Sequence, residues 1–257
     1  MVMAAALLAV GCVKVDGSKM MVSMDYDNPE LYTVGNGEVD VAGVTVIDVD
    51  WVKGDIDVVA YEGEKIVIEE CCDDEIAEEL EVRHLVQDGV LKVKYAKSGK
   101  QKEMPVKKLT VKVPQGLVLD GLDVNAVTGD VTLSGLTAKH VEVEGVTSGV
   151  RADGLKGNNV EVQTVTGSVT LDLAESEGVG LKAVEVETVM GEVSVALPEG
   201  KGYEAEAETT VGKVTCEGAE NTEKGKYKKG NGEVEIDLTT VTGSVTLDLA
   251  VSEGVGL

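Results

Sequence analysis

Hydrophobic and polar residues alternate along most of this chain. Residues 141–144 and 184–187 both read Val-Glu-Val-Glu, and residues 160–163 read Val-Glu-Val-Gln. A period of two places one side chain in the interior and the next in solvent, which predicts β-strands with one buried face. We therefore expect an all-β fold built from short strands.

These strands belong to a repeated unit, in which a strand, a Thr/Ser-Gly corner and a second strand follow one another. The unit is first seen at residues 126–133 and last at residues 240–247. Its corner glycines are Gly129, Gly149, Gly167, Gly191, Gly212 and Gly243. The first five are separated by 20, 18, 24 and 21 residues, a period typical of a stacked solenoid of short two-strand repeats. We expect the corners to be sensitive to substitution, Gly167 in particular if its φ is positive.

The first half of the chain repeats more loosely. After a segment of residues 13–30 that we interpret as a linker, the repeat domain covers residues 31–257, loosely repeated to about residue 113 and regularly after it. Residues 164–181 recur as residues 240–257 with one change, Glu175 to Val251. The sequence leaves open whether this end is a recent duplication or the chain is a fragment.

The composition indicates a narrow, aliphatic core and an acidic surface. There is no Phe, a single Trp (Trp51) and six Tyr, so Val, Leu and Ile have to fill the interior, where β-branched residues pack well on a pleated sheet. The formal net charge is −24 and the pI is about 4.4. Binding to nucleic acid needs a basic surface, so we expect no nucleic-acid partner and no direct contact with an anionic membrane.

Residues 1–12 form an apolar run that ends on Gly11 and Cys12. The run is shorter than the roughly 20 residues that span a bilayer as a helix, and it matches the apolar core of an export signal. A small residue before a cysteine resembles a bacterial lipoprotein cleavage site, which makes Cys12 a lipid-anchor candidate. No Lys or Arg precedes the run, and the alternative is a buried first strand. We favour the lipid anchor, which would be the chain's only link to a membrane.

Several segments, taken in their order along the chain, resemble a known family. In the first half they are residues 47–54, 61–69, 88–99 and 107–114, and in the second half the Thr-Gly corners with residues 197–203 and 227–236. Together they resemble the bacterial β-strand-repeat family labelled "putative adhesin", a domain of unknown function, over residues 32–249. The resemblance implies a right-handed β-helix-like solenoid, a location in the cell envelope and no known catalytic residues.

The alternating strands place acidic residues on their outer face. If the repeats stack in register, Glu142, Glu161 and Glu185 form a ladder with steps of about 4.8 Å. Glu144, Gln163 and Glu187 form a second. Like charges opposite each other destabilise a sheet, and a bound cation such as calcium would relieve them. We favour a solvated polar face, because the spacing lacks the glycine-rich loop of calcium motifs, and keep the first three as weak metal candidates.

Three other groups of residues have both a functional and a structural interpretation. Eight lysines could form a docking face for head-to-tail self-association or protect an edge strand, which we favour: Lys92, Lys94, Lys97, Lys100, Lys102, Lys107, Lys108 and Lys112. The pairs Thr164/Thr166 and Thr240/Thr242 could form a flat threonine array, but β-propensity explains them. Cys71, Cys72 and Cys216 contain no C-x-x-C pair, and a bridge from Cys216 to either of the others stays open.

No nucleophile elbow, zinc-protease motif or phosphate loop occurs in the sequence. We therefore expect no enzymatic activity and no cofactor. The reading that fits best is a non-catalytic surface protein of the cell envelope, an adhesin or a structural or interaction module, with an unidentified surface ligand or protein partner. An envelope-stress sensing or signalling ectodomain is the alternative, and a polysaccharide-active enzyme is the reading that we favour least.

Overall fold

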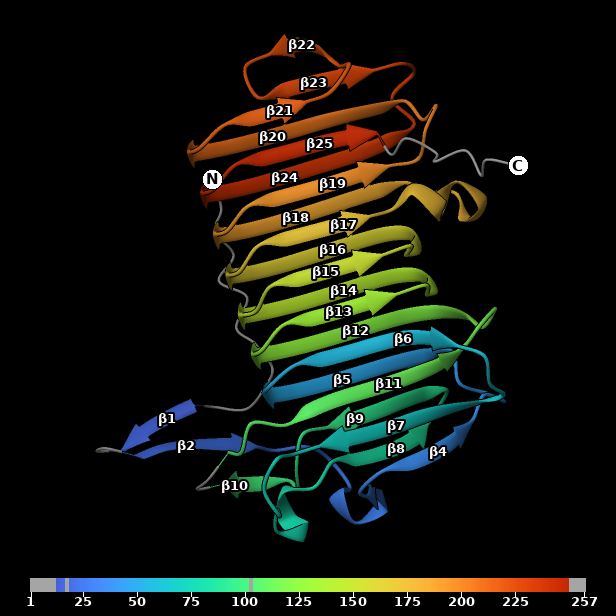
Figure 1. Cartoon of the computed structure of the whole chain (residues 1–257), viewed down its shortest axis with the longest axis vertical. Coiled ribbons are helices and arrows are strands. Elements are labelled where there is room, and N and C mark those ends of the chain that lie inside the picture. The colour runs from blue at the N-terminus through green and yellow to red at the C-terminus, as the bar shows by residue number, and fades with distance from the viewer. Residues whose placement is uncertain (1–12, 17–18, 102–103, 250–257) are drawn as a thin grey trace.

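The chain forms an elongated stack of β-strands (Figure 1) in the computed structural model, which describes residues 13–16, 19–101 and 104–249. The all-β prediction is confirmed, because the strands form two large, mostly parallel sheets and one small sheet. The described helices are three 3-10 turns, η1 (Pro29–Leu31), η2 (Glu78–Leu80) and η3 (Ala174–Val179).

Sheet 1 has twelve strands and sheet 2 has ten. In spatial order, sheet 1 consists of β22 (Glu220–Glu223), β23 (Lys226–Lys229), β20 (Tyr203–Val211), β24 (Val234–Thr242), β18 (Ala183–Met190), β16 (Lys156–Thr166), β14 (Thr137–Thr147), β12 (Val118–Thr128), β5 (Val46–Lys53), β9 (Val90–Lys94), β8 (Arg83–Gln87) and β3 (Thr33–Val34). Sheet 2 consists of β21 (Val214–Cys216), β25 (Val245–Leu249), β19 (Val193–Leu197), β17 (Val169–Asp172), β15 (Val150–Asp153), β13 (Val131–Ser134), β6 (Ile56–Tyr61), β11 (Lys108–Pro114), β7 (Lys65–Cys71) and β4 (Gly37–Asp40). The small sheet consists of β1 (Val13–Asp16), β2 (Lys19–Met24) and β10 (Gly99–Gln101).

Seven rungs make up the stack, each a strand of sheet 1 followed by a strand of sheet 2. Neighbouring rungs pair in parallel in both sheets, so the structure is a solenoid-like repeat. In spatial order the rungs are β5–β6, β12–β13, β14–β15, β16–β17, β18–β19, β24–β25 and β20–β21. Next to the first rung, β9 pairs in parallel with β5, and β11 with β6. Antiparallel strands follow at both ends, β23 and β22 beyond β20 at one end, and β8 with β3 and β7 with β4 beyond β9 and β11 at the other.

The stacking order of the rungs differs from their order along the chain. Strand β24 pairs in parallel with β18 on one side and with β20 on the other, and β25 lies between β19 and β21 in the same way. The last rung of the chain therefore lies inside the stack. It carries residues 240–249, the described part of the near-duplicate segment at residues 240–257.

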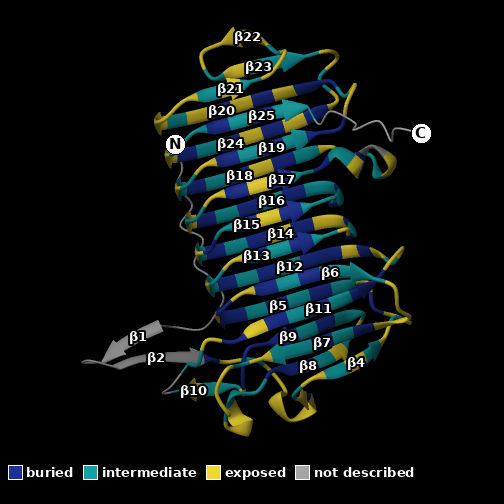
Figure 2. Cartoon of the chain, viewed as in Figure 1, coloured by how far each residue is buried: buried dark blue, intermediate teal, exposed yellow. Residues whose placement is uncertain are grey.

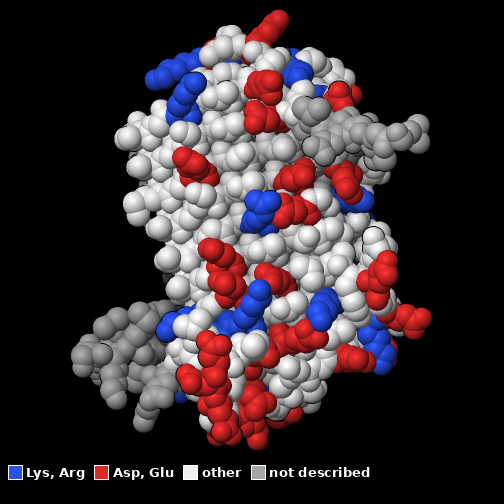
Figure 3. Space-filling view, in the orientation of Figure 1, with Lys and Arg blue, Asp and Glu red and all other residues white. Residues whose placement is uncertain are grey.

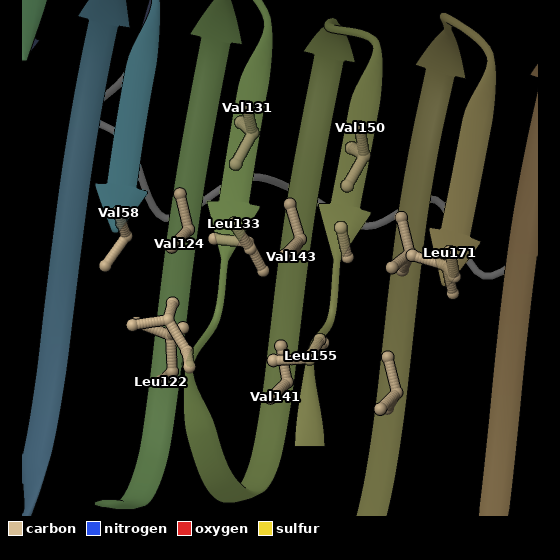
Figure 4. Close-up of a cluster of buried hydrophobic side chains, with 14 of the residues drawn as sticks. Val58, Leu122, Val124, Val131, Leu133, Val141, Val143, Val150, Leu155 and Leu171 are labelled. Atoms are coloured by element: carbon tan, nitrogen blue, oxygen red, sulfur yellow. The ribbon is translucent and has the colours of Figure 1, made fainter. Parts of the chain in front are cut away.

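The interior is narrow because both sheets fill it with aliphatic side chains. Burial alternates along each strand, with the polar residues outside (Figure 2). Val124 and Val143 of sheet 1 face the side chains of Leu133 and Val150 of sheet 2 between the layers (Figure 4). Each such side chain contributes roughly 1.5–3 kcal/mol when it is fully buried. The aliphatic composition thus sets the short distance between the layers.

The corners between the two strands of a rung pack backbone against backbone. A Cβ on Gly167 would lie 2.0 Å from the carbonyl oxygen of Ser148 in the next rung, and one on Gly191 would lie 1.9 Å from that of Gly167. Gly167 also has a φ of 155°. Real Cβ atoms do not approach backbone oxygens this closely, so glycine is required by the rung spacing as well as by the φ angle.

One corner was assigned wrongly from the sequence. Thr128 pairs with Thr147 and Val131 with Val150, so the residue level with Gly129 is Ser148 and not Gly149. The intervals from 129 to 148 and from 148 to 167 are then both 19 residues, which makes the repeat more regular than the glycines suggest. The other predicted corner glycines, Gly129, Gly167, Gly191, Gly212 and Gly243, lie in the same column as Ser148 and Gly54.

Candidate functional site

Two columns of polar residues run along the outer face of sheet 1 in strict register. Glu142, Glu161 and Glu185 pair across β14, β16 and β18 as predicted, and the column extends further at both ends. We define the acidic columns by their members on six rungs. The first column is Asp123, Glu142, Glu161, Glu185, Asp237 and Glu206. The second is Asn125, Glu144, Gln163, Glu187, Thr239 and Glu208.

The carboxylates of the acidic columns repel one another. Partial burial raises the pKa of Asp123, Glu144, Glu185 and Asp237, and the neighbouring carboxylates of the columns raise each of them further. No ion pair among the described residues includes a member of the columns. The face therefore carries unbalanced negative charge.

A row of valines lies beside the acidic columns on the same outer face. It is two residues further along each strand, and we define the valine row as Val127, Val146, Val165, Val189 and Val241. Val165 is 47% exposed and Val241 37%. The valine row and the acidic columns together form what we call the sheet 1 face.

The same three positions on the first rung are covered by the chain itself. On β5 they are Asp48, Asp50 and Val52, in register with Asp123, Asn125 and the start of the valine row. The ammonium of Lys94 lies 3.1 Å from Asp48 and 2.5 Å from Asp50, so one lysine bridges both columns. Val52 is only 5% exposed and belongs to the same core cluster as Met24.

An aromatic pair lies close to this bridge. The rings of Tyr26 and Tyr32 are 4.7 Å apart, and burial raises the pKa of both phenols, with the charge of Lys94 lowering it in part. The hydroxyl of Tyr26 donates a hydrogen bond to the carbonyl of Ala96 at 3.0 Å. The N-terminal end of the sheet 1 face is thus closed by a lysine, two tyrosines and apolar side chains.

The outer face of sheet 2 differs, because its charges are paired. Lys108 contacts Asp57 at 2.7 Å and Lys112 contacts Glu69 at 2.8 Å. On the face of the molecule shown in Figure 3, lysine and arginine side chains likewise lie next to carboxylates. Of the two outer sheet faces, that of sheet 1 therefore carries the unpaired charge.

The eight predicted lysines do not form one docking face. Lys94 is buried at the bridge on sheet 1, whereas Lys108 and Lys112 lie on sheet 2. Lys107 is fully buried, and Lys102 lies outside the described residues. The alternating direction of side chains along a strand and the two-layer architecture separate residues that are close in sequence.

Lys107 is a buried charge that sequence reasoning placed on the surface. Its ammonium pairs with the carboxylate of Glu70 and lies 3.9 Å from the ring centre of Tyr95 and 4.9 Å from that of Trp51. It also donates hydrogen bonds to the carbonyls of Leu80 and Tyr95. Burial lowers the pKa of Lys107, and the Glu70 carboxylate opposes that shift. The single tryptophan of the chain was the one feature of the sequence that could have indicated this buried site, because a lone large aromatic residue marks a special core position.

The remaining candidates form no site. Cys12 lies outside the described residues. Cys71, Cys72 and Cys216 are free, and a bridge is excluded because β7 and β21 lie near opposite ends of sheet 2. Glu142, Glu161 and Glu185 share a ladder, but no group of three or more metal-ligating side chains in the described part of the chain is arranged to hold a metal ion.

The flat threonine array, the alternative that the sequence did not favour, is not formed. Thr164 and Thr240 point inward, where their hydroxyls donate hydrogen bonds to corner carbonyls, each at 3.0 Å. Thr188 and Thr209 do the same at 3.3 and 2.8 Å. These threonines stabilise the corners.

None of the helices in the described part of the chain has the length and apolar character that crossing a membrane requires.

A family model described as Toastrack DUF4097 matches residues 44–183 of the chain. Among solved structures, a "putative cell adhesion protein" from Clostridium sporogenes is 15% identical with a TM-score of 0.49, over 85% of this chain and 100% of that one. A "putative adhesin" from Bacteroides fragilis is 14% identical with a TM-score of 0.34, over 85% of this chain and 97% of that one. No match was found among curated proteins.

Proposed function

The chain belongs to the Toastrack family, and on that premise we propose that it is a non-catalytic interaction module of the bacterial cell envelope. The observation that carries the proposal is the sheet 1 face, a long polar and apolar surface repeated in register on rigid strands. A surface of this kind suits binding, since sites on regular strands hold their side chains in fixed positions.

The chemistry of the described titratable groups supports a binding role. The groups outside the acidic columns with a shifted pKa have a structural cause. Burial raises the pKa of Tyr203 to about 12 and that of the Cys216 thiol to about 11. Lys107 pairs with Glu70 in the core, and Lys94 bridges two aspartates. A catalytic site needs a nucleophile, a base and a charge-stabilising group that converge on one point. The carboxylates of the sheet 1 face are instead spread evenly over six rungs, as in a surface that contacts a partner along its length.

We extend the proposal to the winding and the location of the protein. The coil is right-handed, in line with the strong preference of parallel strand connections for that hand. Cys12 is the lipidated residue that holds the solenoid at the membrane, with the acidic solenoid outside the cytoplasm, where its charge keeps it soluble and away from anionic lipid.

Fractionation of cells that express the wild type or the Cys12→Ala variant tests this function. Both proteins would be labelled with a fatty-acid probe and exposed to protease on intact or outer-membrane-permeabilised cells. We expect the wild type to carry lipid, sit in the membrane fraction and be cleaved, and Cys12→Ala to lose lipid. A wild-type protein that stays unlabelled and protected in the cytosol would overturn the envelope function.

A further inference from the structure

We propose that the sheet 1 face binds a cationic polypeptide segment in which basic and apolar side chains alternate. The inference rests on the proposed function and deepens it by naming the chemistry of the partner. It starts from the valine row, an apolar strip beyond the covered first rung in which Val165 and Val241 are exposed and the other three valines are half-buried.

The geometry of the face sets the spacing of the partner's side chains. Residues two apart on a strand are about 7 Å apart, and rungs are about 4.8 Å apart. Across the face, five rungs therefore present a first-column carboxylate, a second-column polar group and a valine at steps of about 7 Å, and the sixth rung has Thr210 at the valine position. Over six rungs this makes a strip roughly 25 Å long, which matches an extended segment of seven to eight residues at about 3.3 Å each.

The negative charge of the sheet 1 face determines the sign of the charge that a partner must carry. The first column contributes six carboxylates and the second adds Glu144, Glu187 and Glu208. Facing carboxylates this close destabilise a sheet unless cations balance them. A second copy that docked the same face would bring the same charges together, whereas lysine or arginine side chains would neutralise them.

The first rung shows the contact that we expect on the others. There the equivalents of the three positions, Asp48, Asp50 and Val52, are covered from within the chain, the two carboxylates by the ammonium of Lys94 and the valine by apolar packing. The next five rungs repeat the outer pattern without that cover, and on β20 the valine position holds Thr210. A segment with lysines and apolar residues in alternation would continue the arrangement along the solenoid.

The test uses the purified protein and defined peptides. A fluorescent 12-residue peptide of alternating Lys and Val would be titrated by anisotropy at low salt, next to peptides with Lys and Ser or Glu and Val in alternation. We expect the Lys-Val peptide to bind, the Lys-Ser peptide to bind at least about fivefold more weakly, and the Glu-Val peptide not to bind.

Matched variants locate the binding face. We expect Glu142→Gln/Glu161→Gln/Glu185→Gln to raise the Kd of the Lys-Val peptide by about tenfold. Val165→Thr/Val189→Thr should raise it by roughly fivefold, since exposed apolar area is lost without a change of charge. As control, Glu62→Gln/Glu64→Gln/Glu75→Gln alters the net charge equally at three exposed carboxylates away from the face and should change the Kd by less than about twofold.

Two results would overturn the inference. One is a Lys-Val peptide that fails to bind the wild type or binds the two glutamate variants equally well. The other is a wild-type dimer in sedimentation that the valine variant abolishes, because a second copy would then be the occupant. Neither result bears on the location of the protein in the envelope, and a cytosolic location would not change the peptide measurement. The failure of this inference and the failure of the proposed function are therefore distinguishable.

Discussion

The corner of rung β14–β15 has a glycine and a serine where that of the neighbouring rung β16–β17 has a threonine and a glycine. In rung β16–β17 an inward Thr164 precedes Gly167 by three residues, and the threonine hydroxyl bonds to the next corner. In β14–β15 the equivalent residues are Gly145 and Ser148. A Cβ on Gly145 would lie 2.9 Å from the Cβ of Ser148 and 3.3 Å from its hydroxyl oxygen. The glycine at the inward position therefore makes room for the serine at the corner, and we predict that the two positions are energetically coupled.

The structure gives the size of each change. Gly145→Thr alone overpacks the corner, which costs about 1–3 kcal/mol. Ser148→Gly alone removes a buried hydroxyl that has no hydrogen-bond partner among the described residues. Removing it should raise the free energy of unfolding by about 1–3 kcal/mol. The greater backbone freedom of glycine in the unfolded chain offsets about 0.5–1 kcal/mol of this gain. In the double variant the new threonine can bond to the carbonyl of Gly129, for roughly 0.5–1.5 kcal/mol. We expect the double variant to be at least as stable as the wild type, with a coupling free energy of about 2 kcal/mol.

Urea denaturation of the wild type, both single variants and the double variant measures this coupling. The four free energies of unfolding form a double-mutant cycle, and equal slopes against urea establish that the variants unfold alike. The reasoning is refuted if the two single effects add within about 0.5 kcal/mol, or if the double variant is as unstable as Gly145→Thr.

Three further predictions concern corners, surface charge and the buried lysine. Gly167→Ala should lower the free energy of unfolding by about 3–5 kcal/mol, because its Cβ meets a backbone oxygen. Gly154 has a φ of 60° and its Cβ would meet no atom closer than 3.8 Å, so Gly154→Ala should lower the free energy of unfolding by only about 1 kcal/mol. Equal losses in urea denaturation would contradict the close-approach argument. Because the pKa values of Glu185, Asp237, Asp123 and Glu144 are raised in the folded state, the folded protein binds protons more tightly than the unfolded chain. The acidic columns therefore stabilise the protein as pH falls from 7 towards 5 and destabilise it as pH rises. The melting temperature of Glu185→Gln should depend less on pH at low salt than that of the wild type, and an unchanged slope would remove this cause. Lys107→Met should lose about 3–5 kcal/mol by leaving a buried carboxylate unpaired, and adding Glu70→Met should restore most of it; a double variant as unstable as the single one would show that the pair is not the reason.

The sequence was sufficient for the class of fold and for the register of the outer face. Alternation with a period of two fixes which side chains point outward, and the recurring corners mark equivalent positions although the repeats differ in length. Glu142, Glu161 and Glu185 were therefore placed correctly in one ladder. The family resemblance was also correct, since the ordered segments that carry it lie largely within the region that the family model matches. Both inferences rely on local patterns that recur in each repeat.

The errors arose where the local sequence pattern carries no information about which residues are neighbours in three dimensions. A Ser-Gly pair looks like a displaced Thr-Gly corner, and only the strand register shows that Ser148 takes the corner position. The burial of Lys107 needs strands β7, β9 and β11 to meet around Trp51, a contact between segments up to 56 residues apart. Lysine-rich sequence alone predicts solvent exposure, because burying an unpaired charge is costly.

The place of rung β24–β25 inside the stack bears on how the protein is made. A ribosome delivers β20, β21 and the β22–β23 hairpin before it delivers the rung that has to separate them from β18–β19. The solenoid therefore cannot be completed one rung at a time from the emerging end, since two rungs and the hairpin can take their final positions only together. Until Val234 and the residues after it have emerged, the β18 and β19 edges are open to any other strand. A chain of this design therefore exposes an unpaired sheet edge throughout the synthesis of β20 to β23.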